Sequence, residues 1–171
     1  QNSVPYNSCG ISQVINVKGV WECRFIDEIA LENPRNSTEE VCEEFMMRYP
    51  NHKSGLFYYG DASGRNRSTM NKDFKHHYEV IEFKLRKYLS NNSDRTLISN
   101  PSITGRRDFI NLIFEDKLQI RRYFDESCKK TIADMMYVKQ ALDGGKDKHI
   151  VTDKDSGDKY QKYGHFSDLI D

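Results

Sequence analysis

Residues 57–65 read FYYGDASGR, and this stretch decides the fold prediction. An apolar run ends at Gly60, and Asp61 follows at once with small residues behind it. The run predicts a buried strand, and the small residues leave space in front of a carboxylate at its end. The same residue types form turns in which an Asp bonds its own backbone, so a structural role for Asp61 stays open. A P-loop is excluded because its Gly-Lys-Ser/Thr ending is missing.

Strands and helices alternate on both sides of this stretch. Before it, Trp21, Cys23 and Phe25 alternate with charged residues, which predicts a half-buried strand joined to a preceding one through Lys18 and Gly19. The other predicted elements are a helix from the capping box Ser37–Glu40 to Pro50, a helix over 78–89, a strand over 95–99, a helix over 106–117, a strand over 118–124, and a helix from Ser127 to Gly144. This order predicts an α/β fold with a mixed sheet and helices on its faces, in which ligands gather where parallel strands end.

Composition narrows the class of protein. The 171 residues are enough for one domain with a core, and 30% charged against 37% hydrophobic residues predicts a soluble globular chain with no membrane-spanning segment. The net charge of zero leaves any nucleic-acid binding to a local patch. The four cysteines are far apart, which predicts reduced thiols and no structural zinc site.

A second acid stands near the end of the chain, in the stretch GHFSDLID at residues 164–171. Ser167 and Asp168 have the pattern of a helix N-terminus, where an Asp is most often a cap or a partner of the helix dipole. Carboxylates that converge would instead bind Mg²⁺ or Mn²⁺, which prefer oxygen ligands. Such metals can activate water and stabilise the leaving oxygen of a phosphodiester. Asp61 and Asp168 are far apart in the chain and no local pattern shows that they meet, so the structural roles and the metal-binding role of both acids stay open.

Several basic residues follow Asp61, and they could contact a phosphate backbone or belong to a solvated loop. The candidate DNA-binding residues are Arg65, Arg67, Lys72 and Lys75. Arg106 and Arg107 leave the same two possibilities open. The lysines of residues 146–162 are nearly balanced by acids, so this segment is not predicted to be a basic patch. Three other acids could also enter an acidic site, although we expect them to be structural: Asp27, Glu28 and Asp134.

Four sequence motifs follow one another along the chain in an order that is typical of a known protein family. They are FIDEIALENPRNSTEEVCEEFMMRYP at 25–50, YYGDASG at 58–64, CKKTIADM at 128–135, and GHFSDLID at 164–171. Together they resemble the C-terminal nuclease domain of tailed-phage terminase large subunits, in the branch whose pattern runs DEI, YGDxSG, a Cys-Lys helix and GHxSDA. The likeness covers nearly the whole chain, with Leu169 in place of the family's Ala.

The resemblance implies a ribonuclease H-like mixed central sheet flanked by helices, in one nuclease domain spanning residues 1–171. It implies that Asp61 and Asp168 are the second and third of three acids that hold two Mg²⁺ or Mn²⁺ ions. It also implies that His165 lies close to these metals and serves the catalytic site.

The first acid of the family lies in a pattern like D-x-N-x-x-P, and Asn2 and Pro5 match the tail of that pattern. Its Asp is thus expected just upstream of Gln1. The chain starts without Met and ends inside an apparent helix start, so we expect a fragment that lacks the first-strand acid and the N-terminal ATPase domain.

The implied activity is cleavage of double-stranded viral DNA during genome packaging, in the cytoplasm of an infected bacterial cell. The implied partners are the DNA, the terminase ATPase domain, the small subunit and the portal, and no membrane. Two alternatives stay open. One is another ribonuclease H-like nuclease, such as a junction resolvase or transposase core. The other is a catalytically silent docking module of a packaging motor.

Overall fold

The protein is described as a computed structural model over residues 6–53, 55–66, 76–142, 144–152, 154, 157 and 159–170. In these residues the chain is mixed α/β, with four α-helices and a mixed sheet. The elements in chain order are β1 (Tyr6–Val17), β2 (Val20–Glu32), α1 (Thr38–Arg48), η1 (Ala62–Arg65), α2 (His77–Leu85), α3 (Ile103–Phe114), β3 (Ile120–Phe124), α4 (Lys129–Tyr137), β4 (Lys139–Gln140), β5 (Lys146–Asp147), β6 (Ile150–Thr152), β7 (Lys159–Gln161) and η2 (Ser167–Leu169). The α/β class and the mixed sheet predicted from the sequence are confirmed.

The chain divides into two compact units, and each is described by itself. Unit 1 comprises Gln1–Asn7 and Leu31–Asn100, and unit 2 comprises Ser8–Ala30 and Pro101–Asp171. Asp61 belongs to unit 1 and Asp168 to unit 2. That the two units form one nuclease domain stays a prediction.

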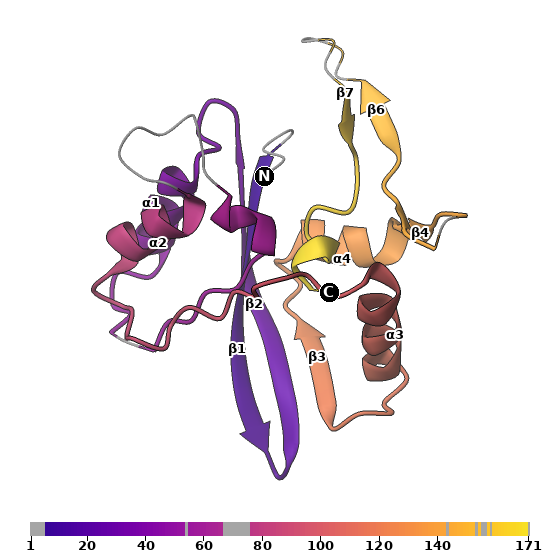
Figure 1. Cartoon of the computed structure of the whole chain (residues 1–171), viewed down its shortest axis with the longest axis horizontal. Helices are drawn as coiled ribbons and strands as arrows, with labels where there is room; N and C mark the ends of the chain where they lie inside the picture. The colour runs from indigo at the N-terminus through magenta and orange to yellow at the C-terminus, as the bar shows by residue number, and fades with distance from the viewer. Residues whose placement is uncertain are drawn as a thin grey trace. The chain divides into compact units, whose positions relative to one another are not determined.

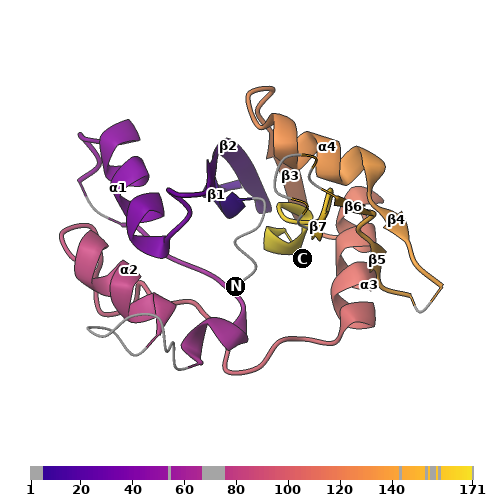
Figure 2. The ribbon, with the colours of Figure 1, turned by 90° about the horizontal axis from the view of Figure 1, so that it is seen from above.

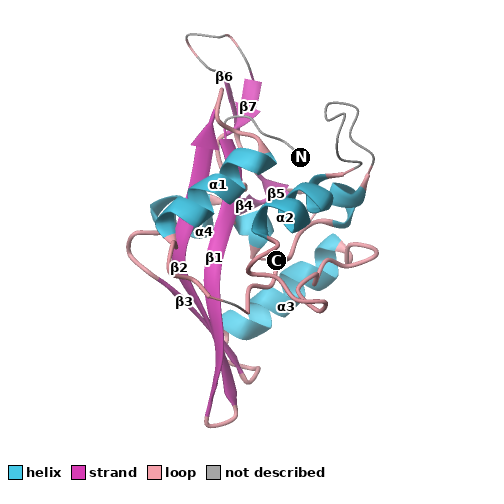
Figure 3. Cartoon of the chain, turned by 90° about the vertical axis from the view of Figure 1, so that its left-hand side faces the viewer, coloured by secondary structure: helices cyan, strands magenta, loops and turns pink. Residues whose placement is uncertain are grey.

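The sheet of unit 2 is built on a long hairpin with strand order β1-β2-β3 (Figures 1 and 3). Lys18 and Gly19 form the turn with φ of 52° and 89°, and positive φ at both central residues matches the twist of a two-residue hairpin. β3 lies parallel to β2, in a register that runs from Trp21 opposite Ile120 to Phe25 opposite Phe124. The hairpin and the strand predicted over 118–124 are confirmed.

An apolar core joins this sheet to the helices of unit 2. Phe25 of β2 stacks on Phe124 of β3, with ring centroids 5.0 Å apart. α3 packs beside β3 and contributes Ile110 and Ile113, while Cys128 is fully buried at the start of α4. The cysteines are free thiols in the structure, as expected, and Cys42 and Cys128 are buried.

Unit 1 is centred on α1 and α2, which pack side by side (Figure 2). α1 begins at the predicted capping box, in which Ser37 accepts from Glu40 N and the Glu40 carboxylate accepts from Ser37 N. Lys84 of α2 reaches Glu43 of α1 at 3.0 Å. The rings of Phe45 and Tyr88 pack edge-on, with their centroids 6.0 Å apart. Aromatic packing and helix pairing therefore hold this unit together.

Two predicted strands are wrong in the described structure. The apolar run before Asp61 is extended, but its ladder is limited to one bridge, in which Tyr58 pairs parallel with Asp94. Residues 95–99 form no strand. Leu97 and Ile98 are 52% and 98% exposed, so the apolar character that predicted the strand is not matched by burial.

The fourth helix is shorter than predicted, because α4 ends at Tyr137 rather than at Gly144. Met136 of this helix is 69% exposed, whereas Asp134 is 2% exposed. Beyond α4, β4 pairs with β5 and β6 with β7, both antiparallel. In the described residues no helix is both long and apolar enough to span a bilayer.

Candidate functional site

Asp61 lies at the turn where the apolar run meets η1, and two glycines shape this turn around Tyr78. A Cβ at Gly60 would overlap the Tyr78 hydroxyl, and one at Gly64 would lie 2.7 Å from ring atom Cζ. Tyr78 is buried and donates from its hydroxyl to the Asp61 backbone carbonyl at 2.6 Å. Burial, and after it the Asp61 carboxylate, raise the pKa of Tyr78, so the phenol stays a donor at neutral pH. The small residues of GDASG thus make room for a tyrosine ring.

The Asp61 carboxylate itself accepts two hydrogen bonds within unit 1. Oδ1 accepts from Ser63 N at 2.7 Å, which makes Asp61 the N-cap of η1. Oδ2 accepts from Asn100 Nδ2 at 2.8 Å, while Asn100 Oδ1 accepts from Ala62 N at 2.9 Å. The side chain is exposed. The turn-forming role left open by the sequence is therefore present, and the carboxylate is also held in a fixed orientation toward solvent.

Arg65, a candidate DNA-binding residue, is engaged inside unit 1. Its guanidinium forms an ion pair with Asp94 at 2.6 Å, hydrogen-bonds Thr96 and lies 5.5 Å from the centroid of the Tyr78 ring. Burial raises the pKa of Asp94, but hydrogen bonds from Thr96 and Arg65 outweigh it and bring the pKa to about 2. Arg65 thus fastens the loop after Asp61 to the segment around Asp94. The other candidates, Arg67, Lys72 and Lys75, lie outside the described residues.

Asp168 lies in η2 of unit 2, where two lysines surround its carboxylate. Lys146 Nζ is 3.1 Å from Oδ1, and Lys148 forms an ion pair with Oδ2. Asp168 does not cap the helix, because η2 has Phe166 at its N-cap and no side-chain cap bond. The acid is instead a charged side chain, 42% exposed, at the first turn. Of the two structural roles that its sequence pattern suggests, the position of Asp168 is that of a partner of the helix dipole and not that of a cap.

A buried carboxylate fixes the turn that carries Asp168. Asp134 Oδ2 accepts from Phe166 N at 2.8 Å and from Ser167 N at 3.2 Å. Asp134, Phe166 and Ser167 are all at most 2% exposed. This contact agrees with the structural role expected for Asp134. The motif CKKTIADM, which contains Asp134, did not indicate that Phe166 and Ser167 would be its partners.

His165, predicted to lie near the metals, is turned into unit 2. Its Nε2 lies 2.7 Å from the backbone carbonyl oxygen of Gln161, and its side chain is only slightly exposed. Because that oxygen can only accept, Nε2 carries the proton. His165 thereby ties the end of β7 to the turn that carries Asp168, which sets its ring orientation.

The acids Asp27 and Glu28, which lie within β2, were expected to be structural, and Glu28 has a clear local function. The Glu28 carboxylate accepts from Lys130 N at 2.7 Å and from Thr131 N at 2.8 Å. It therefore caps α4, whose own N-cap residue, Cys128, makes no side-chain cap bond. The structural role expected for Glu28 is confirmed.

The chemistry of the two candidate ligands suits a hard divalent cation, because each offers carboxylate oxygens. Within the described part of the chain, no group of three or more His, Cys, Asp or Glu side chains could hold a metal ion. Asp61 belongs to unit 1 and Asp168 to unit 2, and each carboxylate is partly exposed to solvent. The metal site predicted from the sequence stays a prediction.

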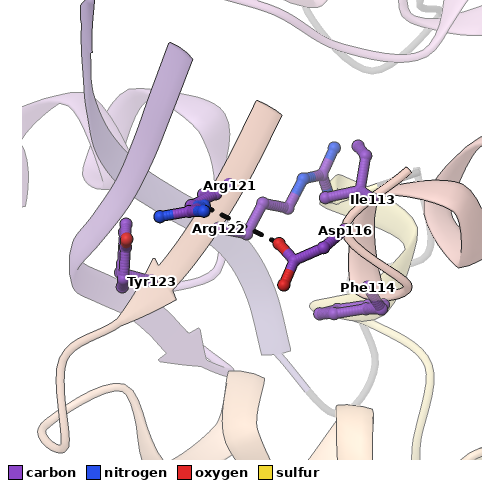
Figure 4. Close-up of a pocket in the computed structure, with 6 residues that line it drawn as sticks. All are labelled: Ile113, Phe114, Asp116, Arg121, Arg122 and Tyr123. Carbon is purple, nitrogen blue, oxygen red and sulfur yellow. Dashed lines mark ion pairs between the residues drawn. The ribbon is translucent and has the colours of Figure 1, made fainter. Parts of the chain in front are cut away.

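A pocket of about 370 Å³ lies elsewhere in unit 2, between the end of α3 and β3 (Figure 4). Its charged lining includes Asp116 and Arg121, whose Nε lies 3.6 Å from Asp116 Oδ1. Tyr123 and Phe114 add aromatic rings. None of its lining residues is a predicted site residue.

Sequence reasoning missed Lys146 and Lys148, because it judged the segment by its balanced charge. Comparisons with protein-family models, with curated proteins and with solved structures found no match for the chain.

Proposed function

We propose that the chain is a metal-dependent endonuclease domain that cuts double-stranded viral DNA during genome packaging. Asp61 and Asp168 are its metal ligands in this proposal, together with an acid upstream of Gln1. The four ordered motifs motivate it, and the mixed sheet with flanking helices is of the class that a ribonuclease H-like fold requires.

One observation carries the proposal furthest: an exposed Asp168 on a turn fixed by the buried Asp134. Burying a carboxylate is costly unless it is well hydrogen-bonded, so its use to hold two backbone N–H groups indicates a turn whose geometry matters. Metal ligands and catalytic groups need such support, because small errors in position weaken binding and rate. An exposed acid that only solubilised the surface would need no buried support.

Bound Mg²⁺ or Mn²⁺ would supply Lewis acidity, lowering the pKa of the attacking water and stabilising the departing oxygen. The residues of the chain do the positioning. Ser63 N and Asn100 Nδ2 orient the two oxygens of Asp61. Asp134 orients the backbone that carries Asp168. Contacts to the phosphate backbone would give weak sequence preference, since base edges are not read.

The same proposal includes a cellular location and binding partners. It would act in the cytoplasm of an infected bacterial cell, with the terminase ATPase domain, the small subunit and the portal as partners. These assignments depend on the motif resemblance alone.

A catalytically silent docking module is the second candidate, and a specific observation favours it. Asp61 caps η1 and bonds Asn100, while Asp168 is ion-paired to two lysines, so both acids have structural partners. In that case removing either acid would change stability and leave no metal-dependent activity to lose.

The test is plasmid cleavage in Mn²⁺ and in EDTA, with three proteins: this chain, a version extended upstream through the expected acid, and the extended version carrying Asp61→Asn. Metal-dependent cutting by the extended wild type, lost in Asp61→Asn, supports the nuclease. Equal cutting by the extended wild type and Asp61→Asn would show that Asp61 is not a ligand. If no version cuts while partner binding is retained, the docking module is favoured.

A further inference from the structure

The pocket of unit 2 between the end of α3 and β3 combines polar and aromatic side chains (Figure 4). Its volume of about 370 Å³ is within the range of small-molecule sites, and its lining includes Ile113 and Arg122. Arg121 and Tyr123 stand two positions apart on β3, so both project from the same face of the strand. From the other side, Phe114 ends α3 and Asp116 follows it by two positions. The two elements thus bring a donor, an acceptor and two rings to one pocket.

Asp116 occupies a position where stability alone would favour another residue. Its φ of 55° lies in the left-handed region, where Gly is preferred directly after a helix. Asp116 N donates to Ile113 O at 3.1 Å and Lys117 N donates to Leu112 O at 2.9 Å, which is the hydrogen-bond pattern of a Schellman motif. The carboxylate also lies at the negative end of the helix dipole. Ending the helix therefore does not explain an acid at this position.

The ion pair between Asp116 and Arg121 does not explain it either. Arg121 Nε lies 3.6 Å from Asp116 Oδ1, and both side chains are more than half exposed. Ion pairs that are this exposed contribute little to stability. Figure 4 shows the two side chains directed toward one another across the pocket wall. They therefore offer a ligand one charged acceptor and one charged donor side by side.

The aromatic rings of the pocket are open to a planar ligand. Phe114 is 53% exposed and Tyr123 is 45% exposed. Exposed aromatic faces stack with nucleic-acid bases, and the polar edge of a stacked base is then recognised by neighbouring side chains. Tyr123 shares its strand face with Arg121, so a ring stacked on Tyr123 has its edge beside the ion pair.

The Watson–Crick edge of guanine presents the acceptor O6 next to two donors, N1–H and the 2-amino group. An ionised carboxylate has two acceptor oxygens and no donor, so Asp116 matches the two adjacent donors. The guanidinium of Arg121 is a donor only, and it lies where O6 would be. We propose that this pocket binds a guanine base, with its edge on Asp116 and Arg121 and its ring stacked on Tyr123. This inference does not depend on the proposed nuclease activity.

The other bases match the pair less well. Adenine and cytosine each present one donor group on this edge, and thymine presents a single N–H between two acceptors, so none offers Asp116 two adjacent donors. In a duplex the edge of guanine is occupied by cytosine, so the pocket requires an unpaired guanine. Such a base comes either from a free nucleotide or from a single strand.

The first measurement is a two-dimensional NMR titration of the chain with the monophosphates of guanosine, inosine, adenosine and xanthosine (GMP, IMP, AMP and XMP). IMP lacks the 2-amino group, and XMP has an oxygen in its place. GMP should bind about five- to tenfold more tightly than IMP or AMP, since both lose a hydrogen bond to a charged acceptor. The amides that shift should lie in residues 112–117 and 120–124. Absence of saturation below about 10 mM GMP would overturn the proposal.

Asp116→Asn should change which purine fits, and Asn is tolerated in the left-handed conformation after a helix. Its amide has one acceptor and one donor, which suit N1–H and O2 of XMP but place a donor opposite the 2-amino group of GMP. The variant should lose about tenfold in GMP affinity and bind XMP more tightly than GMP. Asp108→Asn, whose exposed ion pair with Arg107 is also on α3, is the matched control. An unchanged preference for GMP in Asp116→Asn would overturn the assignment.

Arg121→Gln tests the contact with O6. The variant should weaken GMP and IMP by the same factor of about three to ten, because both carry this oxygen. Arg107→Gln, from the ion pair with Asp108, is the control. Circular dichroism of each variant checks that folded proteins are compared. GMP affinity equal to that of the wild type in Arg121→Gln would overturn the proposed edge contact.

Competition with GMP distinguishes the two sources of the base. The competitor is a single-stranded hexanucleotide of dT with one dG. Displacement about tenfold stronger than by GMP itself identifies a single strand as the source, whereas displacement equal to that by GMP identifies the free nucleotide. Both results support the guanine site. Equal displacement by an all-dT strand, or by the same dG within a duplex, would overturn it, because neither has a free guanine edge.

Discussion

Asp134 on α4 accepts a hydrogen bond from the backbone N–H of Phe166 at 2.8 Å, with both residues at most 2% exposed. Thirty-two positions apart in the chain, they join a helix to the turn before η2. The same oxygen accepts from Ser167 N at 3.2 Å. One buried carboxylate therefore accepts hydrogen bonds from two buried backbone donors, which need acceptors away from water.

Asp134→Ala should lower the free energy of unfolding by about 2–3 kcal/mol, because two buried N–H groups lose a charged acceptor. Asp134→Asn keeps one oxygen acceptor and should cost roughly half as much. Urea unfolding followed by circular dichroism measures both, with Asp147→Ala at an exposed position as the control. A loss below about 0.5 kcal/mol in Asp134→Ala would contradict the assigned contact.

Gly60→Ala and Gly64→Ala should each destabilise the protein by about 1–3 kcal/mol, because an added methyl meets buried Tyr78. The two sites differ in what the methyl meets. At Gly60 the nearest atom is the Tyr78 hydroxyl and the ring carbons stand at 3.1 Å, whereas at Gly64 a ring carbon stands at 2.7 Å. Tyr78→Phe should therefore rescue Gly60→Ala but not Gly64→Ala in a double-mutant cycle measured by urea unfolding. Equal rescue at both sites would show that the hydroxyl is not the obstacle.

The prediction for Asp94 concerns acid stability. Its pKa in the folded protein is about 2, below the ordinary 3.8. The ionised group therefore favours folding above pH ~4, and this contribution is lost as the pH falls toward 2. It should amount to about 1 kcal/mol, since partial exposure screens the charges. The stability gap between wild type and Asp94→Asn should accordingly narrow on acidification from pH ~6 to ~2.

Carboxyl NMR titration gives an independent check on Asp94. Arg65→Gln removes one of the hydrogen-bond donors, so the pKa of Asp94 should rise toward 3.8 in that variant. An unchanged pKa would mean that Thr96 alone sets the value. Arg121→Gln, whose ion pair is with Asp116, is the matched control.

The elements that the sequence predicted correctly have their determinants close together in the chain. The hairpin turn at Lys18 and Gly19 needs positive φ at both central residues, and the α1 start needs Ser37 and Glu40 three positions apart. Such local chemistry is visible in a single sequence. The strand over 118–124 was predicted from a short stretch of apolar, aromatic and charged residues, LQIRRYF, with the length of one strand.

The features that the sequence could not give depend on partners far along the chain. Apolar residues before Asp61 predicted a strand, yet a strand needs a neighbour, and this segment has one bridge to Asp94. Asp134 was expected to be structural, but its role depends on Phe166. The ion pairs of Lys146 and Lys148 with Asp168 were not predicted, because the net charge of a segment does not indicate which of its charged side chains are in contact. The type of each residue can be read from the sequence, whereas the partner of a side chain depends on the tertiary structure.

Asp61→Asn, the variant that tests the proposed metal ligand, should itself be destabilising. Asn can keep an oxygen toward Ser63 N, but its amide nitrogen would then face Asn100 Nδ2, which now donates to Asp61 Oδ2. Asn100 cannot turn over without losing its bond from Ala62 N. The expected cost is about 1 kcal/mol, since one hydrogen bond is lost at an exposed site.

The double variant Asp61→Asn/Asn100→Asp reverses the polarity of this contact. The amide introduced at position 61 can donate to the carboxylate introduced at position 100, and that carboxylate still accepts from Ala62 N. The double variant should recover most of the lost stability in urea unfolding and should not recover metal-dependent cleavage, since the acid has moved to another position. Recovery of both would place the required negative charge in the turn as a whole rather than at residue 61. Recovery of neither would show that the Asp61–Asn100 contact does not hold this turn.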